Sequence, residues 1–127
     1  LRSIPGVGKI LALTFFYEIH DIQRFPKVGN FLSYARLVPG VKESDGKRKP
    51  GAAGRKMGTA HLKWAFGEAA TLFLRGHPSH KKLFTRLEKK YGRKKALGVL
   101  AAKLGRAVYY MLKRKKSFDA DRFLKNV

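Results

Sequence analysis

Helical periodicity in the second half of the chain is the feature that most limits how this sequence can fold. After Thr59, apolar residues recur at the i, i+3 and i+4 spacing that places them on one face of a helix. The members of this stripe are Leu62, Ala65, Phe66, Ala69, Ala70 and Phe73. Thr59 is a suitable N-cap, and Gly76-His77-Pro78 is a typical helix stop. The pattern therefore predicts a core-facing helix between these two points.

Two further amphipathic helices are predicted after Pro78. The first has an inward face of Leu83, Phe84, Leu87 and Tyr91 and an outward face of Lys81, Lys82, Arg86, Lys89 and Lys90. Gly92 ends it, in the C′ position that glycine favours. The second and longest is expected to bury Leu97, Leu100, Ala101, Leu104, Val108, Met111 and Leu112. It ends in the basic run 113–116, and the tail with Phe118 and Phe123 is expected to form a short docking turn.

The first third of the chain has a different apolar pattern. Val7 to Ile19 is apolar on every side, which predicts a helix buried within the fold, and residues 27–37 predict another short helix. No segment shows the convincing alternation of a strand. The expected fold is all-α: one compact helical domain over residues 1–127 that contains a helix-hairpin-helix and a long basic central loop. The opening Leu1-Arg2-Ser3 lacks Met, so we expect a fragment of a longer protein.

Charge limits the classes of function. Lys and Arg total 29 against 8 Asp and Glu, which gives a formal net charge of +21. A compact domain with this excess repels itself, so a polyanion is the expected partner, with solubility or simple RNA neutralisation as the alternatives. The absence of Cys excludes disulfides and Cys-based zinc sites. The longest apolar stretch, Ile10 to Tyr17, is too short to span a bilayer, so we expect a cytoplasmic protein without a membrane partner.

Residues 6–12, Gly-Val-Gly-Lys-Ile-Leu-Ala, fit the helix-hairpin-helix pattern of Gly, apolar residue, Gly, three residues and Ala. Gly6 and Gly8 permit a tight turn and a close backbone approach, so that the amides of the next helix can point at a phosphate. Lys9 can add a charge-assisted contact. Such contacts hold a nucleic-acid backbone without reading its sequence. The alternative is a Gly-rich helix start with Val7 as an ordinary core residue.

The stretch 38–54 has no apolar period and is rich in Gly, Lys, Arg and Pro. Loops of this length inside a compact domain are usually functional or disordered. Basic residues gather in it and directly after it: Lys42, Lys47, Arg48, Lys49, Arg55 and Lys56. This density suits contact with phosphates, and a solvated charged loop is the alternative.

Ser44 stands near the start of that loop, between Glu43 and Asp45. A serine hydroxyl becomes a nucleophile only when a base or a metal helps to remove its proton. A phosphodiester under attack also needs cations near its nonbridging oxygens, and the neighbouring Lys and Arg residues meet this second requirement. Most loop serines instead form turns or hydrogen-bond a phosphate, so the residue types leave both roles open.

Several motifs in this order resemble the C-terminal domain of insertion-sequence transposases of the one-ten, one-one-six and nine-oh-two family. The motifs are Ile4 to Gly8, Glu18 to Phe25, Leu37-Val38-Pro39, Ser44 with Gly46-Lys47, Lys56-Met57-Gly58 and Leu62-Lys63. The resemblance covers at least residues 1–75. The resemblance implies a DNA recombinase in which this domain supplies a serine, here Ser44, that attacks DNA and becomes transiently linked to it. On this interpretation Lys47, Arg48, Lys49, Arg55, Lys56 and Lys63 hold phosphates.

The resemblance also implies partners that lie outside this chain. An N-terminal RuvC-like domain, absent here, would carry metal-binding acids, so we expect Mg²⁺ in the full-length protein and no cofactor in this fragment. DNA, a structured guide RNA and further copies of the full-length chain are the other expected partners. The alternative function is a non-catalytic helix-hairpin-helix module that clamps the backbone of DNA or RNA.

The sequence departs from the family pattern at several positions. Arg36 stands where the family usually has Gly, Asp45 replaces Gly beside the serine, and Lys63 replaces Arg. Asp45 places a carboxylate next to the attacking oxygen, where it either helps to position a metal or repels phosphate, and the sequence leaves both open.

Two aromatic features have competing interpretations. Tyr109 and Tyr110 would suit a tyrosine recombinase, but the chain has no His-x-x-Arg motif, so we interpret them as structural. Trp64 lies off the apolar stripe of its helix. It can stack on a base, but packing against a neighbouring helix or at the interface of a missing domain is the expected role.

Overall fold

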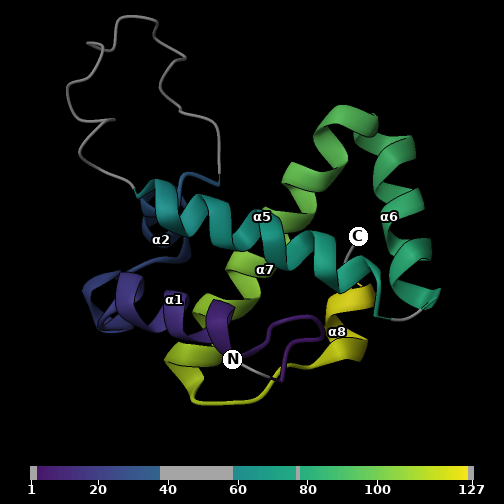
Figure 1. Ribbon diagram of the computed structural model, residues 1–127. Helices are drawn as coiled ribbons and strands as arrows, with labels where there is room; N and C mark the ends of the chain where they lie inside the picture. Colours follow the sequence, from purple (N-terminus) through teal and green to yellow (C-terminus); the bar gives the residue numbers. More distant parts are fainter. Residues whose placement is uncertain (1–2, 38–58, 77, 126–127) are drawn as a thin grey trace, which may run out of the picture.

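The computed structural model of the protein describes residues 3–37, 59–76 and 78–125. Over these residues the chain is helical without a strand, which confirms the predicted all-α class (Figure 1). The elements in chain order are α1 (Lys9–Ile19), the 3-10 helix η1 (Ile22–Arg24), α2 (Val28–Tyr34), α5 (Ala60–Leu74), α6 (Pro78–Tyr91), α7 (Arg93–Arg114) and α8 (Ala120–Lys125).

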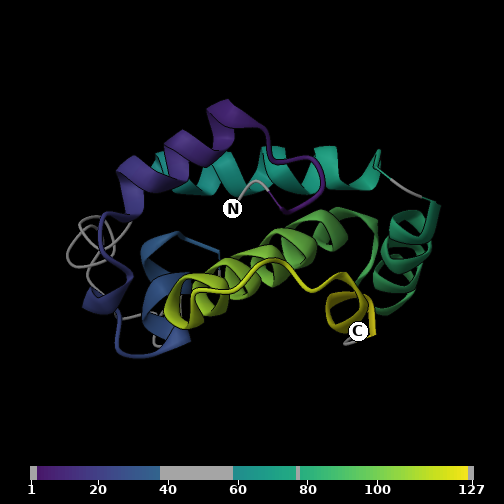
Figure 2. The ribbon, with the colours of Figure 1, turned by 90° about the horizontal axis from the view of Figure 1, so that it is seen from below.

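The 22-residue helix α7 lies at the centre of the arrangement. Helices α5, α6 and α2 and the 3-10 helix η1 all pack against it. Seen from below, α1 and α5 form one layer and α7 lies in a second layer with α2 and α8 beside it, while α6 closes one end (Figure 2). The core therefore lies between the α1–α5 layer and α7.

The predicted apolar stripes form most of this core. Helix α5 buries every residue of its stripe, and the Thr59 hydroxyl caps its start by accepting a 3.1 Å hydrogen bond from the His61 amide. Helix α7 buries Leu100, Ala101, Leu104, Val108 and Met111, as predicted. The predicted burial of Tyr91 and Leu97 is wrong, because both are more than one-third exposed. They flank the corner between α6 and α7, where a helix end has fewer neighbours than a helix middle.

Aromatic rings connect the helices across the core. Phe15 of α1 and Phe66 of α5 lie with ring centroids 4.5 Å apart. Phe31 of α2 contacts both Phe66 and Tyr109 of α7. The buried Tyr109 hydroxyl donates a 2.8 Å hydrogen bond to the backbone oxygen of Phe25, so this tyrosine is structural, as predicted.

The C-terminal tail docks on the end of α5, as predicted. Phe123 of α8 is buried with its ring 5.2 Å from that of Phe73. The ring of His80 stacks on the ring of Phe73, with ring centroids 3.9 Å apart. Because a carbonyl oxygen only accepts, His80 Nδ1 donates the 2.7 Å hydrogen bond that joins it to the backbone of Phe73.

The predicted burial of the whole 7–19 segment is wrong. Helix α1 buries only Leu11, Phe15 and Ile19, which follow one another at intervals of four on the side that packs against α5. Its other sides carry large apolar residues that are 45–75% exposed, namely Ile10, Leu13, Phe16 and Tyr17. The reason is position, since among the described elements α5 is the one against which α1 packs extensively, and the two lie in the same layer (Figure 2).

The chain passes very close to the end of α5 at Gly6. This residue has a φ of +92°, and a Cβ atom added to it would lie 2.8 Å from the backbone carbon of Leu72 and 2.9 Å from the nitrogen of Phe73. Gly8 has a φ of −91° and open space around its Cα. The two glycines of the same motif thus face different constraints.

We predict that Gly6→Ala lowers the free energy of unfolding by about 2–4 kcal/mol, because it combines a positive φ with a backbone collision. Gly8→Ala is the matched control and should cost less than about 1 kcal/mol, since it changes only an N-cap. Urea unfolding followed by circular dichroism measures both. Equal losses for the two variants would contradict the packing role of Gly6.

Candidate nucleic-acid interface

Helices α1 and α5 run antiparallel. At one end, Gly6 lies against Leu72 near the last turn of α5. At the other end, the carboxylate of Glu18 accepts a 2.9 Å hydrogen bond from the hydroxyl of Thr59 and lies 3.7 Å from His61 Nδ1. The two contacts fix the direction of α1 relative to α5.

This geometry separates two groups of predicted phosphate-binding residues. Gly6, Gly8 and Lys9 lie at the end of the pair where α5 finishes, whereas Lys63 lies in the first turn of α5. Nine residues of helix, about 13 Å along the axis, separate Lys63 from Leu72. Lys9 and Lys63 are both exposed, so each can reach a ligand, but the structure does not bring them together at one point.

The hairpin motif has an open helix start. Gly8 is the N-cap of α1 in an extended conformation and makes no side-chain cap hydrogen bond. Val7 is buried beneath the turn, as the motif predicts. Residues 3–8 form a turn and an extended stretch instead of a helix, so the first helix of a hairpin is not among the described residues. The helix-hairpin-helix and its grip on phosphate stay predictions.

The residues on either side of the segment 38–58 are joined by hydrogen bonds. The amide of Thr59 donates to the backbone oxygen of Tyr34 at 2.9 Å, which joins the two sides, while the amide of Leu37 donates to the backbone oxygen of Leu32 at the end of α2. The end of α2 and the start of α5, with Lys63, therefore lie together. Ser44, Lys47, Arg48, Lys49, Arg55 and Lys56 lie within the segment 38–58, outside the described residues.

Arg36 adopts a backbone conformation that glycine favours. It follows α2 with a φ of +58°, in the left-handed region of backbone conformation. Glycine adopts this region without steric cost, whereas a residue with a Cβ atom does not. A glycine at this position would therefore suit the backbone that the chain forms here better than Arg36 does.

Exposed aromatic rings gather at the same end of the α1–α5 pair as Lys63. Phe16 and Tyr17, near the end of α1, are 65% and 66% exposed. Trp64, beside Lys63, is 53% exposed, so it does not pack into a neighbouring helix of the described fold. The described fold thus gives Trp64 no buried position against a neighbouring helix, and its role at the interface of a missing domain stays a prediction.

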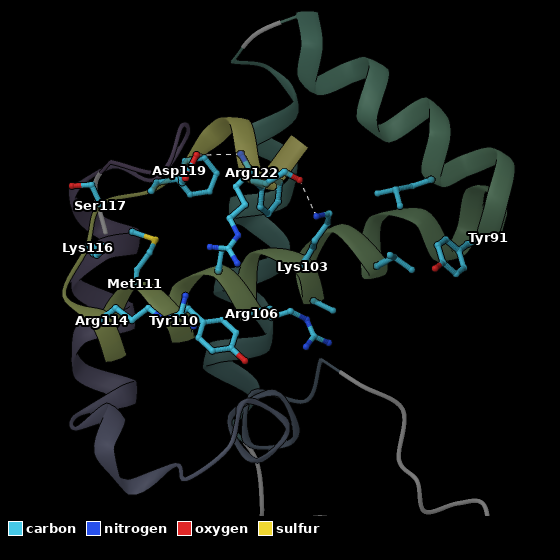
Figure 3. Close-up of a pocket in the computed structure, with 16 residues that line it drawn as sticks. Tyr91, Lys103, Arg106, Tyr110, Met111, Arg114, Lys116, Ser117, Asp119 and Arg122 are labelled. Atoms are coloured by element: carbon cyan, nitrogen blue, oxygen red, sulfur yellow. Dashed lines mark hydrogen bonds between the residues drawn. The ribbon is translucent and has the colours of Figure 1, made fainter. Parts of the chain in front are cut away.

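A basic groove that the sequence analysis did not identify lies between α6, α7 and α8 (Figure 3). Its volume is about 710 Å³. The charged residues that line it are Lys103, Arg106, Arg114, Lys116, Arg122 and Asp119. We refer to it as the α7–α8 groove. The spacing of the basic residues on α7 could have indicated one wall of the groove from the sequence. The position of α8 beside that wall depends on the tertiary fold.

Basic side chains crowd one end of this groove. Burial, followed by the charges of Arg106 and Arg86, lowers the pKa of Lys103 from its ordinary value of 10.5. Its ammonium donates a 2.9 Å hydrogen bond to the backbone oxygen of Phe123, and Arg86 donates to that of Leu124. These carbonyls near the end of α8 carry partial negative charge, which explains why the two cations gather there.

The described residues contain neither a candidate metal cluster nor a membrane-spanning helix. Among them, no three His, Asp or Glu side chains gather in a way that could hold a metal ion. None of the helices described is long and apolar enough to cross a bilayer.

Comparison with known proteins identifies a family for most of the chain. The family described as Transposase IS116/IS110/IS902 matches residues 1–85, about two-thirds of the chain. The matched region runs from the hairpin motif through α1, α2 and α5 into α6, and it includes position 44. No curated protein and no solved structure matches the chain.

The crowding around Lys103 predicts a dependence of stability on pH. Because its pKa is lower in the folded protein than in the unfolded chain, the unfolded chain holds the proton more tightly between the two values, and stability rises with pH there. The free energy of unfolding of the protein minus that of Lys103→Met should therefore increase from neutral pH towards 10.5. Denaturant unfolding at several pH values measures this, and a constant difference would contradict it.

Proposed function

Since the chain belongs to the Transposase IS116/IS110/IS902 family, we propose that it is the DNA-binding domain of a transposase and that it carries the catalytic serine, Ser44. The observation that carries this proposal is the family match over residues 1–85, a region that contains Ser44 and all of the predicted phosphate-binding residues.

In the proposed reaction, Ser44 Oγ attacks the phosphorus of a DNA phosphodiester. A bond forms between Oγ and phosphorus, the bond from phosphorus to one DNA oxygen breaks, and that oxygen leaves with a proton as a free hydroxyl. The other end of the DNA stays joined to Ser44, and attack by a second DNA hydroxyl on this phosphoserine bond reverses the step. Negative charge builds up on the nonbridging oxygens during attack, so cations beside them lower the barrier.

The predicted cations for this role are Lys47, Arg48, Lys49, Arg55, Lys56 and Lys63. Lys63 supports the proposal because its side chain is exposed in the first turn of α5, next to the point at which the chain returns from the segment 38–58. Gly6, Gly8 and Lys9 would hold backbone phosphates at a second point on the DNA.

The family resemblance implies Mg²⁺ held by acids of an N-terminal RuvC-like domain. The described residues of this chain do not fit such a site, since no three acidic or His side chains gather among them. No step of the proposed reaction is assigned to a metal held by this chain. DNA, a structured RNA and further copies of the full-length protein are its proposed partners, in the cytoplasm.

A non-catalytic DNA- or RNA-binding module is the second candidate function. The net charge of +21 and the exposed basic face of α6 favour nucleic-acid binding whether or not Ser44 reacts.

The test of the proposed chemistry is Ser44→Ala in the full-length transposase with the DNA ends and RNA of its element. Strand transfer should fall to background, because the attacking oxygen is removed, while DNA binding stays within about two-fold. Ser33→Ala, an exposed serine on α2, is the matched control and should keep full activity. Strand transfer that survives in Ser44→Ala would favour the non-catalytic module.

The 127-residue chain by itself should bind duplex DNA without cutting it. Each neutralised phosphate contributes about 0.9 to the slope of log affinity against log salt, so contacts with five or more give a slope steeper than about −4. Fluorescence anisotropy at several salt concentrations measures the slope, and a gel assay with Mg²⁺ detects cleavage. A flat dependence would contradict binding to the backbone, and cleavage by the chain alone would contradict the need for a second domain.

A further inference from the structure

The α7–α8 groove has features that the proposed function does not use. One wall is a stripe on α7 formed by Lys103, Arg106, Tyr110 and Arg114, whose spacings of three, four and four place them on one helix face. Arg122 reaches from α8 towards this stripe from the opposite side (Figure 3). Residues from two separate helices thus direct positive charge into one space.

The cations in this groove lack counter-charges in the described part of the chain. Asp119 is the one carboxylate in the lining, and its oxygen accepts a 3.1 Å hydrogen bond from the backbone amide of Arg122 at the start of α8. The ion pairs given for the described residues, His61–Glu18 and Arg93–Glu88, lie outside the groove. Burial, followed by the charges of Arg106 and Arg86, lowers the pKa of Lys103 beside the groove.

Part of the lining of the groove is apolar. The apolar side chains that line the groove include Leu87, Val99, Met111, Phe118 and Phe123. Aromatic rings stand among the cations, because Tyr110 and Tyr91 are 36% and 42% exposed, and the guanidinium of Arg114 lies 4.6 Å from the centre of the Tyr110 ring. A ligand that suits this lining must combine negative charges with flat apolar groups.

Single-stranded nucleic acid has this combination, because phosphates and unpaired bases alternate along it. A volume of about 710 Å³ is in the range of small-ligand sites, so the groove accommodates roughly one or two nucleotides of a strand. A base-paired duplex is too wide to enter such a space. An acidic peptide would meet the positive charge but would leave the exposed tyrosine rings without stacking partners.

We propose that the α7–α8 groove binds single-stranded nucleic acid, with phosphates at Arg106, Arg114 and Arg122 and a base stacked on Tyr110. This inference rests on the nucleic-acid-binding part of the proposed function and is independent of the chemistry of Ser44. All residues that line the groove come after residue 86 in the sequence. They therefore lie outside the region that the family matches.

The test measures binding of the purified chain to fluorescein-labelled oligothymidine and to a blunt DNA duplex by fluorescence anisotropy. Tyr110→Ala should weaken oligothymidine binding at least about five-fold by removing a stacking ring, and should leave duplex binding unchanged. Tyr110→Phe keeps the ring and should bind like the original protein. Arg106→Ala should reduce the salt slope for oligothymidine by about 0.7, the value for one phosphate of a single strand.

Lys95→Ala is the matched control for charge, since Lys95 is exposed on α7 and does not line the groove. It should change the oligothymidine salt slope less than Arg106→Ala does. Thermal unfolding by circular dichroism checks each variant, and Arg122→Ala, an exposed position, replaces Tyr110→Ala if the latter fails to fold.

Other outcomes would overturn the inference. Duplex binding with no effect of the groove variants on oligothymidine would reject the groove alone and leave the proposed function intact. Failure to bind either nucleic acid would reject both. Binding of a polyglutamate peptide with the same dependence on Tyr110 would assign the groove to an acidic peptide instead.

Discussion

The burial of one face of α7 is the interaction on which the rest of the structure depends. Leu100, Leu104 and Val108 are almost fully buried on that face, and the neighbouring helices α2, α5 and α6 all pack against α7. The Tyr109 hydroxyl ties the same helix to the segment before α2 through Phe25. Because the apolar face is enclosed, the stripe of cations on the adjoining face must point towards α8 and solvent. The fold thus exposes this charge as a consequence of forming its core.

Acidic residues are too few to balance the cations, and the structure uses several of them for local contacts. Glu18 joins α1 to the start of α5 through Thr59, while Asp21 and Asp119 accept backbone amides at the starts of η1 and α8. Contacts of this kind shape the chain but leave the long-range repulsion in place. A polyanion that binds the basic surface would therefore both stabilise the domain and serve the function proposed for it.

Much of the helical architecture was predictable because its signals are local. The stripe of α5, its Thr59 cap and the end of α6 at Gly92 each depend on residues within about one helical turn. The predictions that were wrong concern coverage by other elements. Phe16 on α1 and Leu97 on α7 both lie in apolar patterns, yet both are exposed. The reason is that the apolar period of a helix does not determine how many other elements cover it.

The candidate sites divide in the same way. The sequence by itself determined the charge excess, the helices and the motifs that carry the family likeness, because these depend on residue types and short spacings. Only the tertiary structure decided that Lys9 and Lys63 lie at opposite ends of α5, and that Gly6 must be small to pass Leu72. The α7–α8 groove likewise exists because Lys103 meets Phe123, twenty residues away. Contacts between distant residues depend on how helices pack, and spacing along the chain does not encode that packing.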